Sequence, residues 1–346
     1  MIAIASCCLP ELLDAQFLPP ARGARPPAPQ SAPEAAGVGT EGSGPSSSAS
    51  ARELVSPPQD AGARKDSPVD PYDPTNVENR IPVAARQNPR AVAVIIGNER
   101  YAQGDIPPVK YATRDARAVR KYFTTAFGVP EENVIYHENA TKGTLQAVFG
   151  TADDADGRLA SLIDRPDETD VYVYYAGHGM PDAGTGKAYL MPTDADAEQV
   201  RLTGYEVQGL YANLAKLGAR SLTVVVDACF SGVADGGGSL LTAERGALRV
   251  EDPILAAQNA VLITAGKSDQ VAHAFDRQQH GLMTYYFLAG IRGAADRDQD
   301  GRVTARELEV WLSQEVVREA RRLRNRRQEP QVRAANADRV VVEVAR

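Results

Sequence analysis

The chain has 346 residues, enough to bury the core of one large domain or two smaller ones. Its formal net charge of −7 gives no general attraction to nucleic acid or anionic membranes, and no apolar run reaches the length of a transmembrane helix. The three cysteines, two of them adjacent, exclude the disulfide framework of a small secreted domain, so we expect Cys229 to be a free thiol.

The first part of the chain is predicted to be a disordered tail or tether. Residues 1–87 are rich in Pro, Ala, Gly and Ser and have few large apolar side chains to offset the entropy of ordering, so we expect the folded domain at 88–346. The run Ile4-Ala5-Ser6-Cys7 resembles the end of a bacterial lipoprotein signal, but no basic stretch precedes it. Two locations stay open: the cytoplasm, or export as a lipoprotein tethered through Cys7.

Strands and helices are predicted to alternate through the folded part. Apolar runs predict strands at 91–97, 133–137, 170–175, 188–192, 221–227 and 260–264, with a last strand at 339–344 returning to the sheet edge. Apolar residues at helical spacing predict helices at 111–126, 207–217, 282–291 and 305–324, and one that begins at 141. This alternation predicts an α/β layer fold with a mostly parallel sheet of about six strands.

Two of these strands carry reactive side chains to the same edge of the sheet. His178 follows the strand at 170–175 between two glycines, and Cys229 follows the strand at 221–227. Open α/β folds bind ligands at the carboxyl ends of their strands, so we expect the two side chains to meet in space. A neighbouring histidine helps a cysteine to hold the nucleophilic thiolate. The backbone N–H groups of Gly179 and Cys229 are the expected oxyanion hole. The alternative is a structural cysteine and a histidine satisfied in the core.

The residues around this pair resemble the motifs of a known family. Tyr174-Tyr175-Ala176-Gly177-His178-Gly179 and Asp227-Ala228-Cys229-Phe230-Ser231-Gly232 are similar to the histidine and cysteine motifs of the caspase-like cysteine proteases, nearest to the bacterial metacaspase and orthocaspase branch. Residues 94–101 and 111–116 resemble that branch's first strand and first helix. The resemblance covers roughly 91–346. It implies a caspase-like three-layer sandwich and an endopeptidase that uses a Cys/His dyad, with no cofactor required for the chemistry.

The same resemblance implies a substrate preference. In metacaspases an acidic pocket takes Arg or Lys before the cleaved bond, and the matching acids here are Asp115 and Asp227. Two carboxylates suit a guanidinium group, so a protein or peptide substrate with a basic residue at the cleavage site is expected. The family's serine two residues before the histidine is Ala176 in this chain. A less favoured alternative is an Asp-binding pocket built on Lys110 or Arg114.

Residues 296–307 have the pattern of an EF-hand calcium loop, with oxygen-bearing side chains at positions 1, 3, 5, 9 and 12 and a glycine at position 6 for the sharp turn. The predicted ligands are Asp296, Asp298, Asp300, Arg302, Thr304 and Glu307. The alternative is a helix start at which Thr304 and Glu307 form a capping box. If the loop binds calcium, we expect the ion to stimulate the protease rather than take part in its chemistry.

The glycine-rich segment 232–250 reads as an exposed loop, the kind of site where proteolytic cuts concentrate. If the protease processes itself, we expect the cut after Arg245 or Arg249, giving a large and a small subunit that stay associated. Two other hypotheses remain: a catalytically weak calcium-binding scaffold or interaction module on the same frame, and a hydrolase of a non-peptide acyl substrate. The sequence predicts no oligomeric state.

Overall fold

The computed structural model describes residues 75–182, 184–231, 253–256, 259–267, 269–324 and 326–344. All of them belong to the second of the two units into which the chain divides, Arg64–Arg346. Most of the predicted tail, with Cys7, and the loop arginines Arg245 and Arg249 lie outside the described residues.

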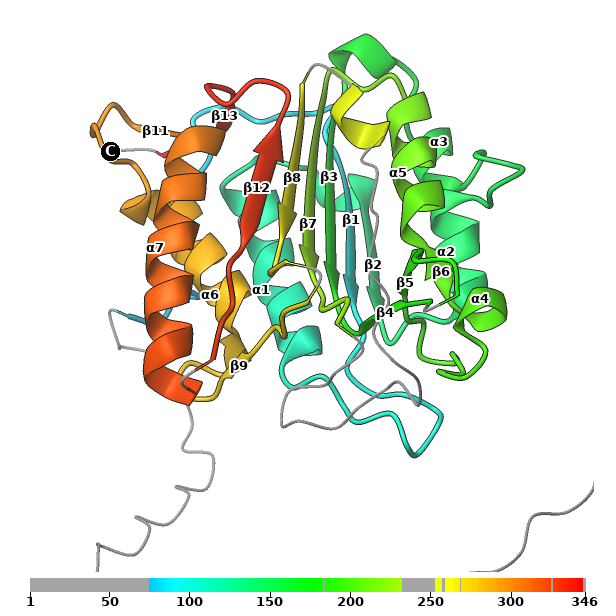
Figure 1. The fold of residues 1–346 in the computed structure, drawn as a ribbon. Coiled ribbons are helices and arrows are strands. Elements are labelled where there is room, and N and C mark those ends of the chain that lie inside the picture. The colour runs from blue at the N-terminus through cyan, green and yellow to red at the C-terminus, as the bar shows by residue number, and fades with distance from the viewer. Residues whose placement is uncertain are drawn as a thin grey trace, which may run out of the picture. The chain divides into compact units, whose positions relative to one another are not determined.

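A six-stranded sheet with the order β12-β8-β7-β3-β1-β2 forms the centre of the fold (Figure 1). Five strands are parallel, and the edge strand β12 runs antiparallel to β8. The strands are β1 (Val92–Gly97), β2 (Val134–Glu138), β3 (Asp170–Ala176), β7 (Ser221–Asp227), β8 (Ala260–Thr264) and β12 (Gln331–Ala334). All residues of β1 and β3 are buried, as expected for apolar strands covered on both faces.

Helices cover both faces of this sheet (Figure 1). One face carries α1 (Ala112–Thr125), α6 (Leu282–Ala289) and α7 (Ala305–Arg324), and the other carries α2 (Lys142–Phe149), α3 (Arg158–Ser161) and α5 (Val207–Lys216). Along β1, Ala93 and Ile95 pack into the first core, whereas Val94 and Ile96 pack into the second. The predicted three-layer α/β sandwich with six mostly parallel strands is confirmed.

Short elements complete the domain. A three-stranded sheet contains β4 (Gly179–Pro181), β5 (Ala188–Leu190) and β6 (Tyr205–Glu206), and α4 (Val200–Thr203) packs beside it. Two small antiparallel pairs join β9 (Ala274–Phe275) to β10 (His280–Gly281), and β11 (Arg302–Thr304) to β13 (Val340–Glu343). A π-helical turn at Gly290–Ala294 follows α6, and 3-10 turns lie at Glu131–Asn133, Pro166–Glu168 and Pro253–Ala256. No helix in the described residues is long and apolar enough to cross a membrane.

Two predicted strands have other partners than expected. The strand predicted at 188–192 is β5, which belongs to the small three-stranded sheet, and the strand predicted at 339–344 is β13, which pairs with β11. The sheet edge is formed instead by β12, whose residues Gln-Val-Arg-Ala lack a continuous apolar run and are only partly buried or exposed. An edge strand pairs with one neighbouring strand and is little buried, so its sequence need not be apolar and is hard to recognise as a strand.

The packed chain begins before residue 88. Val77 is fully buried in the core, and its carbonyl accepts a 2.6 Å hydrogen bond from the Tyr122 hydroxyl on α1. Tyr285 on α6 donates to the carbonyl of Thr75, and Arg292 donates to those of Asn76 and Asn79. The segment 75–79 is therefore part of the domain.

Candidate active site

The neighbouring strands β3 and β7 bring His178 and Cys229 to the same edge of the sheet. Ala176 pairs with Asp227 at the end of the ladder, and the Gly177 N–H donates to the Asp227 carbonyl at 3.3 Å. The chain then leaves both strands together, so His178 and Cys229 line one cavity of about 300 Å³. A Cβ atom at Gly179 would lie 2.6 Å from the Cys229 carbonyl oxygen, so this close approach requires glycine.

His178 is held with one ring nitrogen engaged. Its Nε2 lies 2.8 Å from the Pro107 carbonyl oxygen, and a carbonyl accepts only from a protonated nitrogen. The neutral ring then keeps Nδ1 as its proton acceptor. The His178 backbone N–H donates to the Tyr101 hydroxyl at 2.8 Å, and the two rings lie 5.0 Å apart. Burial lowers the pKa of His178. The hydrogen bond to the Pro107 carbonyl acts in the other direction but does not cancel this effect. The neutral ring suits a proton acceptor.

Cys229 lies at the wall of the cavity with a backbone donor on its sulfur. The Ala272 N–H, in the segment between β8 and β9, donates to the Cys229 Sγ at 2.6 Å. A donor aimed at sulfur favours the charged thiolate over the neutral thiol. Ala272 and His273 line the same cavity as Cys229, so this segment forms the wall beside the nucleophile.

Two buried carboxylates line the same cavity. Asp115, in the first turn of α1, is 2% exposed, and Asp227, the last residue of β7, is 7% exposed. A Cβ atom at Gly281 would lie 2.7 Å from Asp227 Oδ2 and 3.0 Å from Asp115 Oδ2. The two carboxylates therefore converge on the backbone of one residue, which has no side chain to separate them.

Neighbouring donors fix both carboxylates. Asp115 accepts from His280 Nδ1 at 2.5 Å and from the Gly281 N–H at 2.8 Å. Asp227 accepts from the Thr284 hydroxyl at 2.6 Å and from the Thr284 N–H at 3.1 Å. Asp115 thus accepts from a histidine ring, whereas among the described residues the side-chain donor to Asp227 is the neutral Thr284.

Burial sets the ionisation of this pair. Desolvation raises the pKa of Asp115, although the hydrogen bond from His280 opposes the rise. Desolvation also raises the pKa of Asp227 to about 7; the Thr284 hydrogen bond lowers it, and the negative charge of Asp115 adds to the rise. An entering cation would favour the ionised forms and be bound by them.

The cations required by the alternative, Asp-binding pocket are engaged elsewhere. Lys110 lines the cavity but forms an ion pair with Asp276 at 3.2 Å. Arg114 forms a 2.8 Å ion pair with Glu78.

Several residues of the site were not found from the sequence. His280, Gly281 and Thr284 hold or flank the two acids, Pro107 holds His178, and Ala272 contacts Cys229. The sequence signal that could have pointed to this part of the site was His280-Gly281 directly before an apolar helix. A glycine at such a place allows the backbone to approach another group closely.

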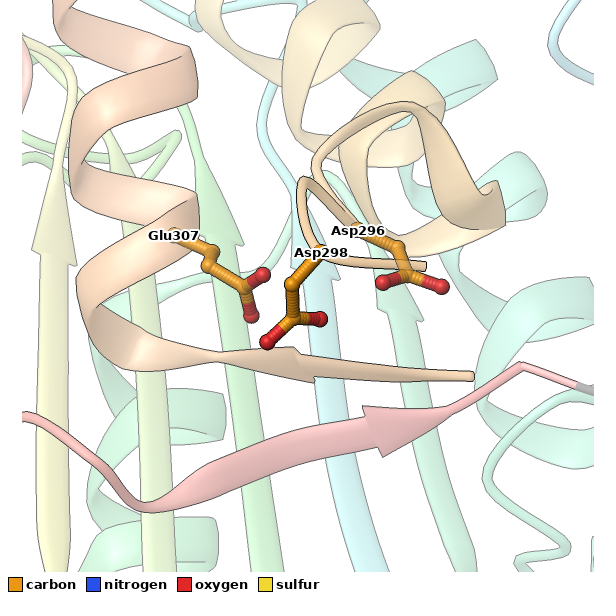
Figure 2. A group of neighbouring side chains, drawn as sticks. All are labelled: Asp296, Asp298 and Glu307. Atoms are coloured by element: carbon orange, nitrogen blue, oxygen red, sulfur yellow. The ribbon is translucent and has the colours of Figure 1, made fainter. Parts of the chain in front are cut away.

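The EF-hand-like loop brings three of its predicted ligands together. The side chains of Asp296, Asp298 and Glu307 offer carboxylate oxygens within 4.8 Å of one another, with Glu307 coming from the first turn of α7 (Figure 2). Asp300 is not in this group, and its carboxylate accepts from the Arg302 N–H at 2.7 Å. Gly301, with φ of 87°, makes the sharp turn that the pattern expects.

The predicted alternative for this loop is also present. Glu307 accepts from the Thr304 N–H at 2.9 Å, and its own N–H donates to the Thr304 hydroxyl at 3.2 Å, which is a capping box. Val303, directly before Thr304, is buried on β11 and pairs with Val342 on β13. The loop is thus braced by a strand of the same domain.

Comparison with known proteins identifies the class. The family model for the caspase domain matches residues 90–341. The chain is similar to the solved structure of caspase-1 from Spodoptera frugiperda, with 15% sequence identity and a TM-score of 0.48 over 74% of this chain and 91% of that chain. A search of curated proteins finds no match.

A domain with this fold and this family match is a cysteine-type endopeptidase acting on protein substrates, and it needs no cofactor for its chemistry. Because the match spans most of the sequence, the chain belongs to the caspase domain family. The resemblance inferred from the histidine and cysteine motifs is confirmed at the level of this family.

Proposed function

We propose that this endopeptidase uses a His178–Cys229 dyad and cuts after Arg or Lys. His178 takes the Cys229 proton on its free ring nitrogen, and the thiolate attacks the carbonyl carbon of the bond to be cut. The N–H groups of Gly179 and Cys229 donate to the resulting oxyanion. The protonated His178 then gives its proton to the leaving amine, and water hydrolyses the thioester to release the acid and regenerate the thiol.

The observation that carries the specificity is the convergence of two buried carboxylates in the cavity that Cys229 lines. Asp115 and Asp227 approach the same glycine, so a guanidinium or ammonium group at that point contacts both. A substrate aspartate would meet two like charges, and the nearby cations Lys110 and Arg114 are already paired. Ala176 supplies no hydroxyl to this pocket, so recognition rests on the two acids.

A panel of fluorogenic peptides tests the proposal. Matched peptides that differ only in Arg, Lys, Asp or Ala before the cleaved bond are incubated with the full chain, with Cys229→Ala and with Asp227→Asn. Expected are cleavage after Arg and then Lys, none by Cys229→Ala, and a loss of about 10²-fold in kcat/KM for Asp227→Asn, because a buried charge pair loses one partner. Cleavage after Asp, or none with an intact fold, contradicts the proposal.

We also propose that the 296–307 loop binds calcium and stimulates the enzyme. The support is the sequence pattern together with the three converging carboxylates (Figure 2). Calcium titration with the melting temperature as readout should stabilise the full chain but not Asp298→Asn, and peptide cleavage should rise in parallel. Calcium stabilisation without cleavage of any peptide would favour the scaffold hypothesis, and identical melting curves with calcium and EDTA would reject the calcium site.

Self-processing in the 232–250 segment is a further part of the proposal, and it rests on the sequence because that segment is outside the described residues. Denaturing gels of the full chain, with Cys229→Ala and an Arg245→Gln/Arg249→Gln variant beside it, provide the test. Two fragments are expected from the unmodified protein alone. Equal fragments from Cys229→Ala would show that another protease makes the cut.

A further inference from the structure

Glu78 is separated from the acidic pocket by a single side chain, although it belongs to the segment 75–79 ahead of the first strand. Its carboxylate contacts His280, which in turn donates to the pocket acid Asp115. The Glu78 side chain is 17% exposed, and its backbone N–H donates to the Asn76 side chain at 2.9 Å. Glu78 is therefore fixed next to the pocket without lining the cavity.

The Glu78 carboxylate binds the arginine that precedes Asp115 in the chain. Arg114 Nε and Nη2 lie 2.9 Å and 2.8 Å from Glu78 Oε1, and Arg114 Nη1 donates to Gln279 Oε1 at 2.5 Å. Burial raises the pKa of Asp115, and the charge of Arg114 is one of the effects that oppose this rise. Arg114 is thus near enough to act on the pocket acid, and Glu78 holds its guanidinium group.

The same carboxylate faces the ring that holds Asp115. His280 Nδ1 lies 2.5 Å from Asp115 Oδ1, and His280 Nε2 lies 3.6 Å from Glu78 Oε1. His280 Nε2 is buried and has no hydrogen-bond partner within the described residues. The ring therefore lies between two carboxylates, with Glu78 on the side away from the pocket.

Glu78 carries the charge that these contacts require. Burial acts to raise its pKa, but the hydrogen bond from Lys121 at 3.0 Å and the charge of Arg114 outweigh burial, so the pKa is lowered. Arg114 and Lys121 both lie on α1, the helix that carries Asp115. One ionised carboxylate thus offsets two cations beside the pocket.

We propose that Glu78 is a positioning residue that determines specificity: it holds Arg114 away from the acidic pocket and orients His280 toward Asp115. Both pocket acids then stay available to the basic side chain of the substrate. Without the Glu78 charge, Arg114 becomes an uncompensated cation beside Asp115, which repels an entering guanidinium group. This deepens the proposed function and rests on it for the choice of the basic residue.

Peptides with Arg or its neutral isostere citrulline before the cleaved bond test this role. The separate values of kcat and KM are measured for the full chain, Glu78→Gln, Arg114→Gln and the double variant Glu78→Gln/Arg114→Gln. The matched control is Glu131→Gln, which removes the partner of Arg120, another arginine of α1, outside the cavity. Affinity for both peptides is measured by fluorescence anisotropy on Cys229→Ala with and without Glu78→Gln, and melting curves check each fold.

Glu78→Gln should raise KM for the Arg peptide by about ten-fold with little change in kcat, and lower the Arg-to-citrulline ratio equally, because it removes charge but keeps an oxygen that can face His280. The double variant should recover most of this loss, because the freed cation is also gone. Arg114→Gln alone should not raise KM, and Glu131→Gln should behave as the unmodified protein. A merely structural defect would not be rescued by a second substitution.

The role of Glu78 is rejected, with the specificity intact, if Glu78→Gln keeps the full preference for Arg or if the double variant is as impaired as Glu78→Gln. A ten-fold higher KM in Arg114→Gln also rejects it, and this variant decides if Glu78→Gln does not fold. If the unmodified protein does not prefer Arg to citrulline, the proposed specificity fails and the role of Glu78 fails with it. If no peptide is cut, the anisotropy ratios decide.

Discussion

Gly281→Ala is the sharpest test of the acidic pocket, because it adds one methyl group at the point where the two carboxylates converge. The new Cβ would lie 2.7 Å from Asp227 Oδ2 and 3.0 Å from Asp115 Oδ2. The backbone tolerates alanine, since Gly281 has φ of −61° and ψ of 141°. Any loss therefore comes from contacts with the acids rather than from backbone strain.

The expected effect falls on binding of the basic side chain. Overpacking costs about 1–3 kcal/mol, and displacing one carboxylate from a cation costs about the same. We therefore expect kcat/KM for an Arg peptide to fall by roughly 10- to 100-fold, mostly through KM. Cys229 alkylation by iodoacetamide should keep its rate, because the atoms nearest the added Cβ belong to Asp227 and Asp115 and not to the dyad.

The matched control is Gly209→Ala on α5, where an added Cβ meets nothing within 4 Å. It should leave both KM and the alkylation rate unchanged. An unchanged KM in Gly281→Ala, with the fold intact, would mean that the substrate's basic group does not enter between Asp115 and Asp227.

Three further changes probe the same structure. First, because burial raises the pKa of Asp227 to about 7, this acid gains a proton as the pH falls through that value. KM for an Arg peptide should rise toward pH 5, and Asp227→Asn, already weak, should lose this dependence; a wild-type KM independent of pH contradicts the assignment. Second, His280→Leu removes the 2.5 Å donor to Asp115 and should raise KM by about ten-fold, whereas His280→Asn, which keeps an N–H donor, should recover part of it; equal kinetics of the two variants would exclude a positioning role. Third, Val77→Ala should lower the free energy of unfolding by about 2 kcal/mol in denaturant titrations, because Val77 is fully buried; no change would place segment 75–79 outside the cooperative unit.

The central sheet was predictable because its signals are local. A run of β-branched residues predicts the strand Ser221–Asp227. Because this strand is parallel to Asp170–Ala176, the carboxyl ends of the two strands lie side by side. The strand Gln331–Ala334 was missed because an edge position does not demand an apolar sequence. The strand Val340–Glu343 was assigned to the wrong partner, since its apolar pattern shows that it is buried but not which strand it joins.

In the active site, only the residues that belong to local sequence motifs could be predicted. His178 and Cys229 stand at strand ends, and sequence places strand ends well. The contacts that shape the pocket join residues far apart in the chain: Asp115 to His280, His178 to Pro107, and Cys229 to Ala272. None of these partners has a local pattern of its own, because each is defined by how loops and helices pack at the sheet edge.

The two acids of the pocket are compensated unequally, and this asymmetry separates their roles. Asp115 receives a hydrogen bond from His280, whose other ring nitrogen lies 3.6 Å from Glu78, so its charge has a partner within the protein. Within the described residues Asp227 accepts from the hydroxyl and amide of Thr284, and ionising this buried acid costs folding free energy that these neutral donors offset in part. A protein retains such a group where a ligand supplies the missing charge. Asp227→Asn should therefore raise the melting temperature most at pH 8, where the acid is ionised in both states, and raise it less at pH 5, where Asp227 is protonated in the folded protein but still ionised in the unfolded chain. Asp115→Asn should raise it less, because burial raises the pKa of Asp115 too but the substitution also takes the charged acceptor from His280. The opposite order would assign the ligand's charge to Asp115.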